Sequence, residues 1–168
     1  MFFFEPEPYV GRVIFLATGH RGSKLRANPA VPMMIALIRS NNPLRDVWSE
    51  LEVANGSFIF QPYLRNHAPS SADGLEADNA LLTALDSQPI ARGIAYHSII
   101  ANMHCNFTPT KITDSFVDYR SAHIAGAASE RIITTTHFCE ADHEVIDEVQ
   151  RILHTHLFEL SVISGAAR

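Results

Sequence analysis

The run Arg-Val-Ile-Phe-Leu-Ala-Thr at residues 12–18 decides the fold class that we expect for this chain. Its apolar and β-branched residues follow one another with little polar alternation, which is typical of a strand buried on both faces of a parallel sheet. Gly11 precedes the run, and the glycine-containing segment 19–23 follows it. These glycines predict a turn at the carboxyl end of the strand, where open α/β sheets bind their ligands.

Two later segments have the composition of further strands. Residues 94–100 form a second apolar run behind Gly93, and residues 130–135 form a third candidate. A polar loop at residues 102–118 lies between the second and third candidates. Because helical segments also separate and follow these runs, we predict an α/β domain with a small parallel sheet of about three strands.

The other segments are helical by their apolar spacing or loop-like by their composition. Helices or helical turns are expected at residues 31–38, 44–53, 78–85, 121–123 and 141–157. Trp48 and Leu51 are expected on the inner face of the second of these helices. Residues 69–74 are expected to form a loop, and residues 161–168 a frayed tail.

Composition and charge restrict the class of protein. The 168 residues are 46% hydrophobic and 18% charged, which is a globular composition large enough for one domain. A formal net charge of −5, with Lys and Arg scattered singly, argues against nucleic acid as a partner. The sequence has neither the roughly 18–20 apolar residues in a row that span a bilayer nor a secretory signal. With Cys105 and Cys139 expected to be buried or half-buried free thiols, we expect a cytoplasmic protein.

Two side chains follow strand candidates at positions where α/β sheets place chemistry. Asp114 follows the second strand candidate, and His137 follows the third. A carboxylate that accepts the Nδ1 hydrogen of an imidazole fixes its tautomer and leaves Nε2 free to take a proton from a nucleophile. The order of acid and then histidine is that of the α/β-hydrolase triad, in which serine comes first. Asp118 is a rival for the acid position.

We expect neither a metal nor a cofactor. His137, Cys139, Asp142 and His143 lie close together in the sequence. Their spacing matches none of the structural zinc patterns, which need two well-separated pairs of ligands. We expect Asp142 and His143 to begin the last helix instead.

Four segments resemble a bacterial, esterase- and lipase-like group of α/β-hydrolases. Residues 11–23 look like the strand and loop that follow the nucleophile elbow, and residues 96–100 look like the strand before the triad acid. Residues 113–123 resemble the segment with the triad aspartate, and residues 136–138 the segment with the triad histidine. The resemblance covers about residues 3–157.

This resemblance implies the C-terminal half of an α/β-hydrolase fold. The partial domain would occupy residues 1–160, with a helical cap-like insertion at residues 24–88 and the tail at residues 161–168. Full-length relatives would be serine esterases or lipases that act on an ester-type small molecule or a lipid.

The resemblance also implies roles for individual side chains. Asp114 would be the triad acid and His137 the triad base. Apart from the resemblance, His20, Arg21 and Ser23 are candidates to line a substrate pocket, because their loop lies at the ligand-binding edge of the sheet. The alternative is a turn in which Arg21 is simply solvated.

The sequence departs from this group in three places. No G-x-S-x-G nucleophile motif occurs in it, so the serine and the oxyanion-hole donor beside it are missing. Gly19 stands where the group usually has proline. Ser115 and Phe116 stand where the group usually has glycine and a small or branched residue. We expect a truncated hydrolase-like chain that is inactive alone.

The strand at residues 12–18 would normally pair with a preceding strand of the group's sheet. Without that neighbour it would expose an apolar edge. Three consequences are open. The edge pairs with its twin in a homodimer or with a separately encoded N-terminal half; the chain aggregates; or the chain is a truncated gene product with no independent role, which is the hypothesis that we favour. Two classes of function follow: a serine hydrolase completed by a partner that carries the elbow, and a non-catalytic interaction module or remnant.

Overall fold

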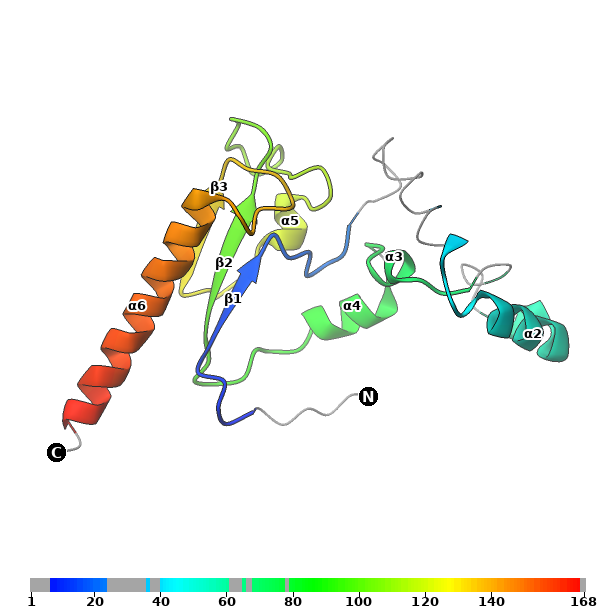
Figure 1. Cartoon of the computed structure of the whole chain (residues 1–168), viewed down its shortest axis with the longest axis horizontal. Helices are drawn as coiled ribbons and strands as arrows, with labels where there is room; N and C mark the ends of the chain where they lie inside the picture. Colours follow the sequence, from blue (N-terminus) through cyan, green and yellow to red (C-terminus); the bar gives the residue numbers. More distant parts are fainter. Residues whose placement is uncertain are drawn as a thin grey trace.

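The computed structural model describes residues 7–23, 36, 40–60, 65, 68–77 and 79–166. Within these residues one parallel sheet is formed by β1 (Arg12–Leu16), β2 (Ala95–Ala101) and β3 (Ser129–Ile133). β2 lies between β1 and β3, and helix α6 (His143–Ala166) runs beside the sheet (Figure 1). The protein therefore has an α/β fold with a three-stranded parallel sheet, which confirms the fold class expected from the apolar runs.

The strand register brings the three carboxyl ends to one edge of the sheet. Ile14 of β1 pairs with His97 of β2, and His97 pairs with Ser129 of β3. β2 is buried from His97 to its end, whereas β1 is only half-buried along its length. The expectation that β1 is buried on both faces is wrong, because within the described residues β1 has a neighbouring strand on one side alone.

Alternating side chains of the strands build two apolar layers, because successive residues of a strand point to opposite faces. The layer on the α6 side contains Ile99, Ala101, Ile133, Val145 and Ile152. The layer on the opposite side contains Ile100, Ile112, Val117 and Ala122, the last of these from α5 (Tyr119–Ala122). The strands are thus covered by α6 on one face and by α5 and its preceding loop on the other.

Ion pairs hold α6 against the strands. Glu148, whose side chain is 3% exposed, pairs with Arg131 of β3 at 2.9 Å and with Arg151 at 2.7 Å. The hydrogen bond from Arg151 is the main cause that lowers the pKa of Glu148 below its ordinary value, although burial acts in the opposite direction. A further pair joins Arg12 of β1 to Glu159 of α6. The pairs with Arg131 and Arg12 join α6 to β3 and β1, whereas the pair of Glu148 with Arg151 lies within α6.

The segment between β1 and β2 contains short helices that lie to one side of the sheet (Figure 1). They are α2 (Arg45–Asn55), η2 (Ser57–Ile59), α3 (Ser71–Gly74) and α4 (Ala80–Asp86). The predicted helices at residues 44–53 and 78–85 correspond to α2 and α4. The helix predicted at residues 31–38 lies largely outside the described residues.

Two expectations for this segment are wrong. The first concerns the inner face of α2, which has no buried residue: Leu51 is 42% exposed, and Trp48 is half-buried. The second concerns residues 69–74, where α3 replaces the predicted loop. The backbone N–H of Ser70 donates to Asp73 Oδ2 at 2.8 Å, and the Ser70 hydroxyl donates to the same atom. These two hydrogen bonds from Ser70 to the Asp73 side chain stabilise a helical turn that composition alone does not reveal.

The last helix continues beyond its predicted end. The tail expected at residues 161–168 is helical as far as Ala166, so this expectation is wrong over most of its length. The hydroxyls of Ser161 and Ser164 donate to carbonyl oxygens one turn earlier, at 2.6 and 2.8 Å, so that neither competes with the helix. Among the described helices none is long and apolar enough to cross a membrane.

We predict that Ile152→Ala lowers the free energy of unfolding by about 2–5 kcal/mol. The reason is that Ile152 is 0% exposed, in the layer between α6 and the sheet. Leu153→Ala is the matched control, since Leu153 is the next residue of α6 and is 48% exposed; it should cost no more than about 1 kcal/mol. Urea unfolding measures both variants, and equal losses would contradict the packing of α6.

Candidate active site

The Asp114 carboxylate lies at the centre of a tight turn in the loop after β2. Its Oδ1 accepts the backbone N–H groups of Phe116 at 2.8 Å and Val117 at 2.7 Å. The Thr113 hydroxyl braces the same turn by donating to the carbonyl oxygen of Val117 at 3.1 Å. The Asp114 side chain is 1% exposed, so these hydrogen bonds replace the water that a carboxylate would otherwise bind.

His137 lies in the loop after β3 and forms a further hydrogen bond with this carboxylate. Its Nδ1 is 2.8 Å from Asp114 Oδ2, the oxygen that the turn leaves free. Because a carboxylate accepts, this contact makes Nδ1 the protonated nitrogen of the neutral imidazole. The His137 side chain is 30% exposed, and within the described residues Nε2 has no hydrogen-bond partner. Nε2 is therefore able to exchange a proton with a bound group.

Electrostatics at this pair favour the imidazolium. The hydrogen bond to Asp114 raises the pKa of His137 above its ordinary value of 6.5, and the nearby charge of Glu140 acts in the same direction. Burial opposes both effects without cancelling them. The pair therefore has the electrostatic arrangement of a base that becomes positively charged beside a fixed anion.

The geometry also distinguishes between the two rival acids. Asp114 contacts His137, as just described, whereas Asp118 caps α5 by accepting the backbone N–H of Ser121 at 3.1 Å. An N-cap carboxylate binds free N–H groups of the first helical turn. Asp118 thus has a structural task of its own, and Asp114 is the partner of the histidine.

Two residues beside Asp114 extend the site. Ser115 has a φ of 76°, a left-handed conformation that favours glycine. The Phe116 ring packs on His137, with ring centroids 5.0 Å apart and an interplanar angle of 36°. The Phe138 ring packs against both, with its centroid 5.3 Å from the centroid of the His137 ring and 5.9 Å from that of the Phe116 ring. The imidazole is therefore held by a carboxylate and bounded by two phenyl rings.

Asn102, the first residue after β2, organises this region but was not singled out from the sequence. It is 0% exposed, and its backbone N–H donates to the carbonyl oxygen of Ile133 at 2.9 Å. Its side-chain amide donates to the carbonyl oxygen of Asn106 at 3.1 Å. A polar residue directly behind a buried strand is the signal that could have identified it. Asn102 thus links the loop of the acid to the strand that leads to the histidine.

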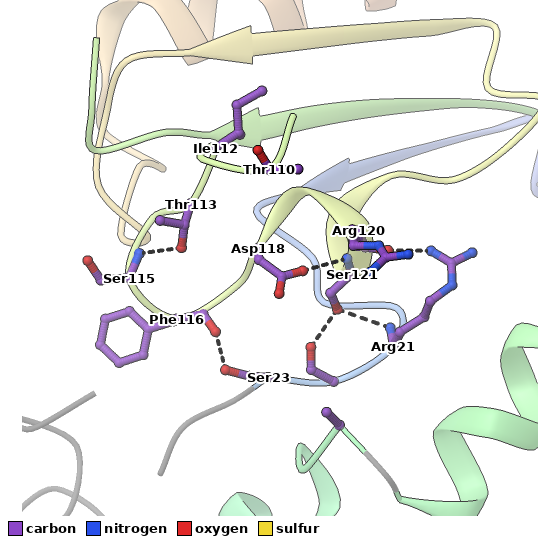
Figure 2. A pocket seen from close by; sticks show the side chains of 12 residues that line it. Arg21, Ser23, Thr110, Ile112, Thr113, Ser115, Phe116, Asp118, Arg120 and Ser121 are labelled. Carbon is purple, nitrogen blue, oxygen red and sulfur yellow. Dashed lines mark hydrogen bonds between the residues drawn. The ribbon is translucent and has the colours of Figure 1, made fainter. Parts of the chain in front are cut away.

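The loop after β1 lies beside the acid but not at the histidine. Arg21 and Ser23, together with Ser115 and Phe116, line a cavity of about 520 Å³ (Figure 2). His20 and Arg21 line a second cavity, of about 690 Å³, between β1 and α4. Neither cavity includes Asp114 or His137 among its walls.

Two of these three loop side chains are already engaged within the protein. The Arg21 guanidinium donates to Asp86 and to the carbonyl oxygens of Arg120 and His123, and the Ser23 hydroxyl donates to the carbonyl oxygen of Phe116. The Nε2 of His20 is buried without a hydrogen-bond partner in the described residues. The placement of a substrate at this loop therefore stays a prediction.

The cysteines have no visible role in this chemistry. Both are free; Cys139 is buried, whereas Cys105 is exposed, so the expectation of burial is wrong for Cys105. Burial raises the pKa of the Cys139 thiol, which disfavours the nucleophilic thiolate. Among the described residues no three His, Cys, Asp or Glu side chains come together as metal ligands do.

Comparison with protein-family models, with curated proteins and with solved structures found no match for this chain. The structure thus defines an α/β protein in which a buried aspartate is paired with a partly exposed histidine, at the edge formed by the carboxyl ends of the strands. A functional assignment must come from the chemistry of that pair.

We predict that Ser115→Gly stabilises the fold by about 0.5–1 kcal/mol. Glycine removes the cost of a side chain at a φ of 76°, and this gain should exceed the loss of the weak hydroxyl contact to Met103. Ser115→Ala is the matched control, because it removes the hydroxyl but keeps the strained backbone. Thermal or urea unfolding compares the three proteins. A Ser115→Gly variant no more stable than Ser115→Ala would show that the turn is not strained.

We predict that the stabilising effect of His137 depends on pH. Because its folded-state pKa is raised, the effect is fully present below about pH 6.5 and is lost as the pH rises through that folded-state pKa. The difference in unfolding free energy between the wild type and His137→Gln should therefore shrink as the pH rises above the ordinary value of 6.5 and through the raised folded-state pKa of His137. Urea unfolding at a series of pH values measures it. A difference that grows with pH would mean that Asp114 does not stabilise the imidazolium.

Proposed function

We propose that Asp114 and His137 are the acid and the base of a serine-hydrolase site that performs acyl transfer on an ester. The observation that carries this proposal is the 2.8 Å hydrogen bond between Asp114 Oδ2 and His137 Nδ1, made by a carboxylate that is 1% exposed. The similarity of residues 113–123 and 136–138 to the triad segments of esterase- and lipase-like α/β-hydrolases supports the same role.

Each group has a defined step in this chemistry. A serine hydroxyl attacks the carbonyl carbon of the ester while His137 Nε2 takes the hydroxyl proton. Asp114 stabilises the imidazolium that forms and keeps the ring oriented. His137 then gives the proton to the leaving alcohol, and water repeats the cycle on the acyl-serine. The proton thus moves from serine to Nε2 and on to the alcohol, and no net charge remains.

The serine and its oxyanion hole must come from a second segment, because no G-x-S-x-G occurs in these residues. The edge of β1 is the natural place for that segment, since within the described residues β1 pairs with β2 alone. We propose that an N-terminal half of the hydrolase sheet adds a strand there and brings the nucleophile to His137. The acyl chain would come from a small ester or a lipid.

A second candidate function is a non-catalytic interaction module. It is favoured by the same open edge of β1, which can also pair with the edge of a second copy. In that case the acid–histidine pair is a structural remnant. Light scattering on the purified chain distinguishes the two: a stable homodimer that does not bind an elbow-bearing polypeptide supports the module.

We predict that a fluorophosphonate probe does not label the chain alone, because no activated serine is present. In a mixture with a polypeptide that supplies the strand and the G-x-S-x-G elbow, encoded upstream, the elbow serine should be labelled. Asp114→Asn and His137→Gln should lower the labelling rate by roughly 10³-fold or more. Asp118→Asn is the matched control and should label at nearly the wild-type rate.

Two results would contradict the proposed function. Stoichiometric labelling of the chain alone would mean that another residue is the nucleophile. Equal labelling rates for the wild type, Asp114→Asn and His137→Gln in the mixture would mean that the pair takes no part in catalysis.

A further inference from the structure

Phe116 belongs to the turn of the acid and also contacts the base. Its backbone N–H donates to Asp114 Oδ1 at 2.8 Å, while its ring lies against the His137 imidazole at a centroid distance of 5.0 Å. Phe116 also contacts the loop after β1, where the Ser23 hydroxyl donates to the Phe116 carbonyl oxygen. Figure 2 shows this carbonyl directed at Ser23 and the ring on the other side of the turn. Three loops therefore determine where the ring lies.

The distance between the two rings lies within the range of a cation–π interaction. A cation within about 6 Å of an aromatic centroid, over the ring face, is attracted by the ring quadrupole. The Phe116 ring lies 5.0 Å from the His137 ring at an angle of 36°, and the Phe138 ring lies 5.3 Å from it at 79°. Of the two phenylalanines, Phe116 is the one whose ring is nearer to the imidazole and whose backbone N–H also binds the Asp114 carboxylate.

We propose that Phe116 is a positioning residue for His137: its ring fixes the plane of the imidazole and stabilises the imidazolium, while its N–H holds the Asp114 carboxylate. This inference rests on the proposed function in so far as the imidazolium is the catalytic intermediate. It concerns a residue at which the chain departs from the hydrolase group that it resembles, where a small or branched residue is usual.

The charged groups that act on His137 are Asp114 and Glu140, and neither is changed by a substitution at position 116. Burial also acts on the pKa of His137, so the series must separate the ring's electrostatics from its bulk. The informative series is the wild type, Phe116→Tyr, Phe116→Leu and a protein with pentafluorophenylalanine at position 116. The last is nearly isosteric with phenylalanine but has a reversed ring quadrupole, so it tests the electrostatics even if the leucine variant folds poorly.

NMR titration of the His137 ring in the full chain measures the effect, with His137→Gln identifying its signal. We expect Phe116→Tyr to keep the wild-type pKa and Phe116→Leu to lower it by about 0.5 pH unit. In the pentafluorophenylalanine protein the pKa of His137 should be lowered by at least the same amount. Phe107→Leu is the matched control, because Phe107 lies in the same loop, is 56% exposed and has no ring contact with His137 in the described residues.

Either of two results would overturn the inference. The first is a His137 pKa that is the same in all four proteins of the series. The second is a shift of the His137 pKa in Phe107→Leu as large as the shift in Phe116→Leu. Either outcome is distinguishable from failure of the proposed function. The titration is made on the chain alone and needs no nucleophile, whereas the proposed function fails when the mixture with the elbow-bearing polypeptide shows no labelling that depends on His137.

Discussion

Parallel pairing of β2 with β1 on one side and β3 on the other determines where every candidate functional group lies. Because all three strands run in one direction, the loops at residues 17–23, 102–118 and 134–142 leave the sheet at the same edge. The acid comes from the second of these loops and the histidine from the third. Asp114 and His137 come from different loops and meet at this edge of the sheet.

The turn around Asp114 fixes the position of the carboxylate at the edge of the sheet. A carboxylate that is 1% exposed would be costly without partners, and here both oxygens are satisfied, one by backbone N–H groups and the other by His137. The backbone of its own turn therefore orients the acid through one carboxylate oxygen, and the other oxygen binds His137. Since the same turn also holds the Phe116 ring, the acid, the ring and the imidazole form one coupled unit, and substitutions within it should not be additive.

Features that depend on a local sequence pattern could be predicted from the sequence, whereas features that depend on contacts with other parts of the fold could not. Continuous apolar runs predicted the three strands because burial leaves a direct mark on composition. The half-buried state of β1 depends on which strand lies beside it, and the helical turn α3 depends on a side chain that reaches back to its own cap. The pairing of acid and histidine was predicted from their order along the chain together with the resemblance of their segments to those of the hydrolase group. The choice of Asp114 over Asp118 did not, because it depends on which carboxylate caps α5. The contact of Phe116 with His137 joins two separate loops and has no signature in either.

Asp114 is the acid that holds the imidazole through the hydrogen on His137 Nδ1. Proton NMR of this hydrogen tests the contact, because a hydrogen bond to a buried carboxylate shifts the signal downfield and slows its exchange with water. We expect the signal in the wild type and in Asp118→Asn, and its loss in Asp114→Asn. A signal that survives in Asp114→Asn, or disappears in Asp118→Asn alone, would show that Asp114 is not the acid that holds His137.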